Sequence, residues 1–265
     1  MPGRTAALGR PPAALVIAGS VAAALLILPL ATLVLATPWS DFLSLLGSEA
    51  VLQALRITAI ASLVTVAACL VLGTPLAWML ARLDFPGRPL LRAAVTVPLV
   101  LPPVVAGVAL VTAFGRTGLI GAPLRDAGIV IPYTTTAVVI AHTFVSMPFY
   151  VLSVEGALRT SGEQYDVVAA TLGATRWTTF WRITLPLAWP GILAGSMLAW
   201  ARSLGEFGAT ITFAGNYPGT TQTMPSLIYT ALQSDPAVAR TLSMILLVVS
   251  LVILGLLRNR WLTSP

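Results

Sequence analysis

The stretch EQYDVVAATLGATRWTTFWRITLP, residues 163–186, separates two strongly apolar segments and carries two short helical patterns. The first pattern repeats apolar side chains every three or four residues, at Tyr165, Val168, Ala169 and Leu172. Gly173 can take the left-handed conformation that ends such a helix. Thr175 can cap a second helix, which we expect Pro186 to stop and whose shared face holds Trp177, Phe180, Trp181 and Thr184. Two short amphipathic helices between apolar segments predict a binding surface.

Composition decides the class of protein. Hydrophobic residues make up 57% of the 265 residues, charged residues 9%, and the mean hydropathy is +0.91. Apolar runs of about 20 residues recur along the chain, which predicts an all-α polytopic membrane protein. Outer-membrane strands would instead alternate over about ten residues. The single cysteine, Cys69, excludes a disulfide within the chain and is expected to be a small buried side chain.

The net charge of +6 comes from arginine alone, because the chain contains no lysine. A phosphate-binding loop of the form G-x-x-x-x-G-K-[ST] is therefore excluded, and the chain cannot hydrolyse ATP in that way. Nucleic-acid binding would need arginines clustered on a soluble face, whereas these are scattered near the ends of apolar runs.

Six apolar runs predict six membrane spans, at residues 13–36, 48–82, 90–114, 133–158, 187–207 and 236–257. Residues 1–12 then form a cytoplasmic N-terminus, and residues 13–265 form a single transmembrane domain. A signal peptide is the alternative for the first run, but that run is about twice the usual length and lacks a convincing cleavage site. Pro98, Pro102 and Pro103 should kink the third span, or contribute to a pathway.

Arginine positions predict the orientation, because cytoplasmic loops carry an excess of positive residues. Ten arginines fall on the predicted inner side, at Arg4, Arg10, Arg82, Arg88, Arg92, Arg159, Arg176, Arg182, Arg258 and Arg260. Five fall outside or within the membrane, at Arg56, Arg116, Arg125, Arg202 and Arg240. This excess predicts that both termini and residues 163–186 lie in the cytoplasm.

Two features inside the predicted spans have a structural or a functional interpretation. His142 is the only histidine, and it can either relay protons or hydrogen-bond to a neighbouring helix. Gly191, Gly195 and Ala199 are spaced by four residues, which predicts a face of small residues for close helix packing.

Residues 163–186 resemble the coupling segment of permease subunits in ABC importers. That family's signature is an acidic residue and two alanines, three residues, glycine, nine residues, then I-x-L-P. Here Gly173 is followed after nine residues by Ile183-Thr184-Leu185-Pro186, whereas Val167 and Val168 replace the first two positions, which leaves Asp166 as the candidate acidic group. The resemblance implies contact with an ATPase through Asp166, Ala169, Leu172, Gly173, Trp177, Phe180, Trp181, Ile183, Leu185 and Pro186. Helices resting on lipid headgroups are the alternative.

The stretch ARSLGEFGATITFAGN, residues 201–216, carries two charged residues at membrane depth. Arg202 and Glu206 are four residues apart, so they can pair on one helix face, either as part of a pathway or to hold the bundle together. With PGTTQTMPSLIY at residues 218–229, this stretch resembles permeases for tetrahedral oxyanions, and most of all the molybdate permease family. Ionisable residues at membrane depth are candidates for a functional site, so we predict a translocation pathway or gate at Arg202, Glu206, Thr210 and Thr212. Thr210, Thr212, Thr220, Thr221 and Thr223 can offer neutral hydroxyl donors or be ordinary loop residues.

Together these resemblances imply a six-span bundle like that of type I ABC importer permeases, located in the cytoplasmic membrane. The implied partners are a second permease copy, two ATP-binding subunits on the cytoplasmic face, an extracytoplasmic oxyanion-binding protein and membrane lipid. The chain itself is expected to hold no catalytic residue, cofactor or metal, because ATP and Mg²⁺ would be bound by the ATPase. Tungstate or sulfate/thiosulfate transport, a heterodimer of permeases and a secondary transporter without an ATPase remain alternatives.

Overall fold

A computed structural model describes residues 12–162 and 164–258 of the chain, and these residues form helices without any strand. They divide into two compact units. The central unit runs from Glu49 to Leu227, and the terminal unit combines the chain up to Ser48 with the chain from Ile228. Predictions that fall on Arg4, Arg10, Glu163 and Arg260 lie outside the described residues.

The terminal unit consists of α1 (Ala13–Ala36), α2 (Trp39–Leu46), α14 (Pro236–Arg258) and the end of α13 (Met224–Ser234). Helix α14 packs on α2, and Arg240 Nε donates a hydrogen bond to the carbonyl of Ala36 at 3.1 Å. Helix α1 is apolar on all sides and has no buried residue. A helix of this kind is suited to contact with lipid along its whole length.

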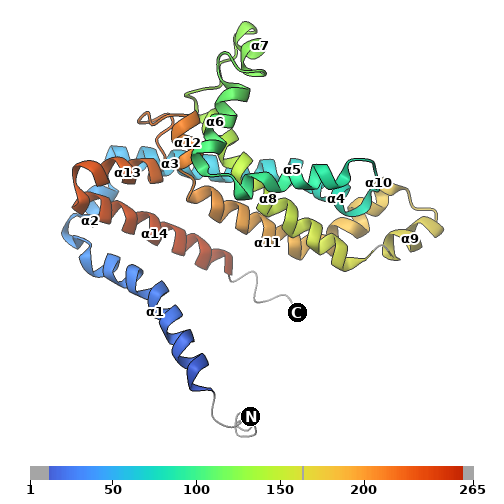
Figure 1. Cartoon of the computed structure of the whole chain (residues 1–265), viewed down its shortest axis with the longest axis horizontal. Helices are drawn as coiled ribbons and strands as arrows, with labels where there is room; N and C mark the ends of the chain where they lie inside the picture. The colour runs from blue at the N-terminus through green and yellow to red at the C-terminus, as the bar shows by residue number, and fades with distance from the viewer. Residues whose placement is uncertain (1–11, 163, 259–265) are drawn as a thin grey trace. The chain divides into compact units, whose positions relative to one another are not determined.

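The central unit begins with one long helix, Glu49–Arg82, made of α3 (Glu49–Ala68), the π-helical turn η1 (Cys69–Gly73) and α4 (Thr74–Arg82). Next come α5 (Arg88–Val100), α6 (Pro103–Phe114), α7 (Gly121–Asp126) and α8 (Thr135–Ser161). The remaining helices are α9 (Gln164–Thr171), α10 (Arg176–Thr179), the π-helical turn η2 (Phe180–Thr184), α11 (Leu185–Leu204) and α12 (Gly208–Phe213). Figure 1 shows α9 and α10 at one end of this unit and α12 near the other.

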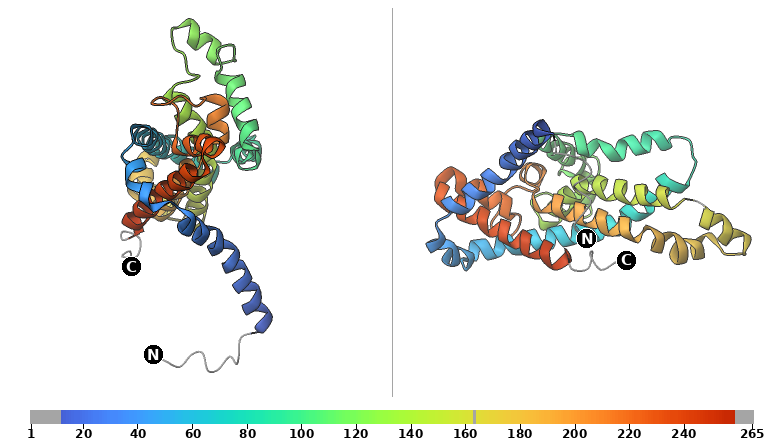
Figure 2. Two further views of the ribbon diagram at one scale, coloured as in Figure 1. Left: turned by 90° about the vertical axis from the view of Figure 1, so that its left-hand side faces the viewer. Right: turned by 90° about the horizontal axis from the view of Figure 1, so that it is seen from below.

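Helices α8 and α11 lie side by side in the centre of this unit (Figures 1 and 2). An added Cβ at Gly191 would lie 2.2 Å from the Cβ of Ala157, and one at Gly195 would lie 3.1 Å from the carbonyl oxygen of Tyr150. Ala199 on the same face is fully buried. The predicted small-residue face is therefore confirmed, and it brings the two backbones close together.

The predicted third span, residues 90–114, is two helices in the structure rather than one kinked helix. Helix α5 ends at Val100 and α6 begins at Pro103, with Leu101 in an extended conformation between them. The cause is the Pro102–Pro103 pair, since a residue before proline is pushed out of the helical region. Pro98, in contrast, remains inside α5.

Four helices among the described residues are long and apolar enough to cross a membrane. They are Ala13–Ala36, Glu49–Arg82, Thr135–Ser161 and Arg176–Leu204. Pro103–Phe114 and Pro236–Val252 are shorter apolar helices. Cys69 is buried in the second long helix, as predicted.

The α8–α11 packing leads to a prediction about stability. Gly191→Ala should destabilise the protein by about 1–3 kcal/mol, the usual cost of forcing a methyl group into a packed contact. Gly156→Ala on α8 is the matched control, since an added Cβ there meets nothing within 4 Å and alanine favours the helix. Thermal unfolding of the detergent-purified protein, followed by tryptophan fluorescence, measures both. Equal midpoints for the two variants would contradict the packing argument.

Candidate functional site

The turn between α9 and α10 has the geometry that ends a helix on a glycine. Gly173 has φ 81°, in the left-handed region, as predicted. Its N–H donates to the carbonyl of Ala170 at 3.0 Å, and the N–H of Ala174 donates to the carbonyl of Ala169 at 3.0 Å. This pair of bonds is the Schellman arrangement. No atom lies within 4 Å of an ideal Cβ at Gly173, so backbone conformation alone favours glycine there.

The second predicted helix begins as expected but does not stop at Pro186. Thr175 caps it by accepting a hydrogen bond from the N–H of Thr178 at 3.2 Å. The chain then continues through η2 into α11 as one helix, Arg176–Leu204. In η2 the N–H of Leu185 reaches back five residues to the carbonyl of Phe180. The helix widens by one residue just before the proline, so the missing N–H of Pro186 falls at the start of a new α-helical segment, where it is tolerated.

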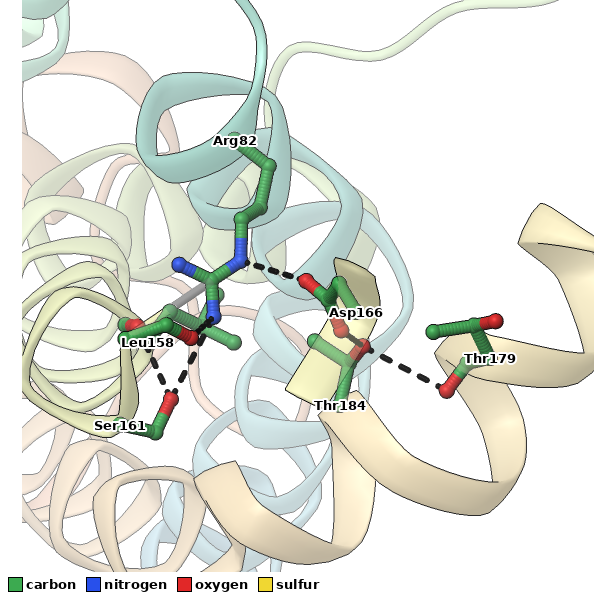
Figure 3. A network of polar contacts seen from close by, with 7 residues as sticks. Arg82, Leu158, Ser161, Asp166, Thr179 and Thr184 are labelled. Carbon is green, nitrogen blue, oxygen red and sulfur yellow. Dashed lines mark hydrogen bonds and ion pairs between the residues drawn. The ribbon is translucent and has the colours of Figure 1, made fainter. Parts of the chain in front are cut away.

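A polar network around Arg82 holds α9 against the end of α4 (Figure 3). Arg82 Nε lies 3.0 Å from Asp166 Oδ2, and Arg82 Nη2 donates to the carbonyl of Gly162 at 2.6 Å. Thr184 Oγ1 donates to Asp166 Oδ1 at 2.9 Å. We call Arg82, Gly162, Asp166 and Thr184 the Arg82 clamp. It joins α4, the junction of α8 and α9, α9 itself and η2.

The Arg82 clamp changes the interpretation of Asp166. The Arg82 side chain is only 8% exposed and that of Asp166 27% exposed, and both carboxylate oxygens of Asp166 bond within the chain. The candidate acidic group of the coupling segment therefore faces inward. Sequence reasoning missed Arg82 and Thr184 as its partners, because they are 84 and 18 residues away from it.

The segment from the end of α9 through α10 to η2 carries large exposed apolar side chains. Leu172 is 82% exposed, Trp177 71% and Trp181 51%. The rings of Trp177 and Trp181 are 5.6 Å apart, and Phe180 turns inward to meet Trp78 of α4 at 6.1 Å. Of the other predicted contact residues, Gly173 and Pro186 are exposed, Ile183 and Leu185 are half-buried and Ala169 is buried.

A cavity of about 250 Å³ lies between α4 and these short helices. Its walls include Trp78, Arg82, Asp166, Val167, Arg176 and Phe180. We call the exposed pair Trp177 and Trp181 the aromatic ridge. It lies beside this cavity, whose lining includes the Arg82–Asp166 ion pair. Such a combination of apolar anchor and recess suits a protein partner.

The second predicted site lies where α11 ends. Arg202 Nη2 and Glu206 Oε2 form an ion pair at 2.6 Å. The helix stops at Leu204, so the pair bridges the end of α11 instead of lying on one helix face. Glu206 is 1% exposed, and its other oxygen accepts a hydrogen bond from the N–H of Ala209 at 2.9 Å, at the start of α12. The carboxylate therefore caps the next helix, which is why the chain breaks before it.

The hydroxyl and imidazole groups near this pair differ in their bonding. His142 Nδ1 lies 2.7 Å from Ser203 Oγ, which is the hydrogen bond to a neighbouring helix that the sequence allowed, while its Nε2 has no hydrogen-bond partner among the described residues. Thr210 is fully buried, and its Oγ1 meets no hydrogen-bond partner in the part of the chain that the structure describes. Thr212 Oγ1 donates to the carbonyl of Gly208 at 2.8 Å. Sequence reasoning missed Ser203, although it is a polar residue directly beside Arg202.

The loop threonines are mostly engaged within the chain. Thr221 Oγ1 accepts a hydrogen bond from the N–H of Tyr217 at 2.9 Å, and Thr223 Oγ1 lies 3.2 Å from Ser226 Oγ. Both threonines are fully buried, whereas Thr220 is exposed. Across the described residues, no group of three or more His, Cys, Asp or Glu side chains is arranged to hold a metal ion.

The sequence of this chain matches a known protein family and several known permeases. Residues 73–264 match the family of binding-protein-dependent transport system inner membrane components. The chain is 49% identical over 231 residues to the molybdenum transport system permease protein ModB of Mycobacterium bovis, covering 86% of this chain and 87% of the relative. It is 42% identical to ModB of Escherichia coli, covering 81% and 92%. The sulfate transport system permease protein CysT of Escherichia coli is 35% identical, covering 87% and 84%.

The fold also occurs among solved structures. A bacterial ABC transporter involved in the import of the acidic polysaccharide alginate has a chain that superposes with a TM-score of 0.74, at 20% identity, covering 94% of this chain and 95% of that one. A bacterial alginate ABC transporter in complex with an alginate pentasaccharide-bound periplasmic protein gives a TM-score of 0.71 at 22% identity, covering 90% of this chain and 89% of that one. The family match and the identity to its relatives lead to one conclusion: this chain belongs to the inner membrane components of binding-protein-dependent transport systems.

Proposed function

We propose that this chain is the permease subunit of an ATP-driven importer of molybdate. The observation that carries this assignment is the 49% identity over 86% of the chain to a molybdenum transport permease. The sulfate permease is less similar, at 35% identity over a comparable length, which favours molybdate over sulfate. The chain is a transport component, and the hydrolytic chemistry belongs to a partner.

The aromatic ridge of α10 and η2 is the proposed docking surface for that ATPase. Exposed Trp177 and Trp181 supply large apolar anchors, which dominate protein interfaces. The Arg82 clamp fixes α9 to the end of the long helix Glu49–Arg82, and η2 continues directly into α11. A push on this surface is therefore delivered to two long helices as a rigid-body movement. ATP and Mg²⁺ would be bound by the ATPase, because a chain without lysine has no phosphate-binding loop.

Six spans fit the helices if α5–α6 and α14 are added to the four long helices. In this arrangement the arginine excess places both termini and α9–α10 in the cytoplasm, where an ATPase can reach them. Two permease copies would enclose the pathway, with two ATPase subunits on the inner face and an oxyanion-binding protein on the outer face. Alternating access would then be driven by the ATPase cycle.

The Arg202–Glu206 pair is the proposed gate, together with Thr210 and Thr212. Glu206 is buried and joins the end of α11 to the start of α12, so a movement of α11 must act on this junction. Thr210 adds a buried hydroxyl that no other described residue bonds. A pathway for a dianion needs donors that bind weakly enough to release it.

Reconstituted uptake tests the proposed function. Proteoliposomes containing the permease, its ATPase and its binding protein should accumulate labelled molybdate only with ATP, and more efficiently than sulfate. Tungstate should compete, because it has the same charge and shape as molybdate. Uptake without the ATPase would identify a secondary transporter, and a preference for sulfate would overturn the substrate assignment.

Substitutions at Gly173 test the proposed docking surface. Gly173→Val should reduce co-purification of the ATPase severalfold, because a β-branched residue at φ 81° costs about 1–2 kcal/mol and shifts the α9–α10 turn. Gly173→Asn is the matched control, since asparagine tolerates the left-handed region. Both variants should remain in the membrane. Normal ATPase association of the valine variant would count against docking at this surface.

Breaking the Arg202–Glu206 ion pair tests the proposed gate. Arg202→Ala removes the ion-pair partner of the buried Glu206, and transport should fall at least tenfold while assembly with the ATPase persists. Arg125→Ala removes an arginine from an exposed pair with Asp126 and should leave transport close to normal. Uptake and co-purification are measured on the same preparations. A parallel loss of assembly and transport would assign the pair a purely structural role.

A further inference from the structure

We propose that the loop between α4 and α5, together with the end of α8, forms a binding site for a tetrahedral oxyanion group. A cavity of about 410 Å³ opens there, next to the one beneath the aromatic ridge, with which it shares Arg82 and Leu83. Its wall carries Arg82, Arg88 and Arg159, from three different helices, with Asp84 and Gly162. The site is distinct from the proposed gate and does not depend on which ion the importer carries.

Two of the three arginines are held in place by a single backbone carbonyl. Arg88 Nε donates to the carbonyl oxygen of Leu80 at 3.0 Å, and Arg159 Nη2 donates to the same oxygen at 3.3 Å. This carbonyl belongs to the last turn of α4, where the helix itself offers no N–H partner. Capping α4 accounts for one N–H of each guanidinium. A guanidinium has five N–H groups, so most donors of Arg88 remain for a ligand.

The charges around the cavity do not cancel. Arg82 pairs with Asp166, and the buried Glu155 is shared by Arg159 and Arg92, each at 3.0 Å. Arg88 forms no ion pair with any described residue. Counting the described residues alone, the arginines at positions 82, 88, 92 and 159 share two paired carboxylates, which leaves an excess of two positive charges (4 − 2). Asp84 at the cavity is exposed, forms no ion pair with the described residues and reduces the excess to one.

The start of α5 adds to the positive potential. Arg88 is the first residue of this helix, and Gly87 before it has φ 88° and offers no capping side chain. The N-terminus of a helix carries partial positive charge, so an arginine there is unfavourable unless an anion is nearby. The first turn of α5 contains no acidic residue. A bound oxyanion would satisfy both the helix end and the Arg88 guanidinium.

The chemistry of the site selects the ligand class. Guanidinium groups bind phosphate-like oxygens through pairs of parallel hydrogen bonds. This planar, forked geometry favours oxyanions over other anions of similar charge. Basic pockets near the ends of membrane helices suit the phosphate of an anionic lipid headgroup. A free oxyanion offers the same tetrahedral oxygens, so the two sources share one chemistry and must be separated by experiment.

The experiment uses the full chain in two formats. In nanodiscs made from phosphatidylcholine with a minority of phosphatidylglycerol, native mass spectrometry measures retained phosphatidylglycerol. In detergent, tryptophan-monitored unfolding measures binding of sodium phosphate and sodium molybdate, with sodium chloride at equal ionic strength as the blank. Arg88→Gln should weaken binding about tenfold or more, because it removes a charged donor. Arg116→Gln, the same change at an exposed position on another loop, should have no effect.

A second variant keeps the test independent of folding. Asp84→Asn removes the carboxylate at the cavity and breaks no ion pair, so it should bind the anion severalfold more tightly than the parent chain. A loss with Arg88→Gln and a gain with Asp84→Asn in the lipid arm assign a headgroup, and the same pattern with phosphate or molybdate assigns a free oxyanion. Absence of binding in both arms, or an equal loss with Arg116→Gln, overturns the site. The site is also overturned if no anion binds and Arg88→Gln lowers ATPase association. In that case the arginines would bind a carboxylate on the ATPase.

Discussion

The ion pair between Arg82 and Asp166 is the contact on which the α9 end of the central unit depends. Helix α9 has eight residues and buries only Ala169, too little apolar surface to hold it in place by packing alone. A guanidinium that is 8% exposed needs a counter-charge, and Asp166 supplies it. The same guanidinium bonds the carbonyl of Gly162, where α8 ends. One side chain therefore fixes a helix that has little other support.

Both proposed functional regions use the same physical device, a carboxylate whose two oxygens bond to an arginine and to a second structural element. Glu206 pairs with Arg202 and caps α12, while Asp166 pairs with Arg82 and accepts from Thr184 in η2. Burying a carboxylate is costly unless both its oxygens are satisfied. Each carboxylate therefore joins two elements and helps to fix their relative position.

The sequence predicted the parts governed by local rules and missed those governed by distant contacts. Gly173 and Thr175 follow from turn and cap chemistry, and the close packing at Gly191 and Gly195 follows from residue spacing. The prediction that Pro186 stops the second helix was wrong, because a π-helical turn depends on packing and leaves no local signature. The inward position of Asp166 was equally out of reach, since Arg82 lies 84 residues earlier in the chain.

The widened turn at η2 has a mechanical consequence. Because it lets the helix pass Pro186 without a break, residues Arg176–Leu204 form one rod of 29 residues, about 43 Å long at 1.5 Å per residue. Its close packing on α8 at Gly191 and Gly195 lies near the middle of that length, beside the interior Pro190. A rigid tilt of about 5° around this point would displace either tip by about 2 Å, given the rise per residue. Inward travel of α10 would then be matched by an opposite travel of Leu204 and its neighbour Ser203 beside His142.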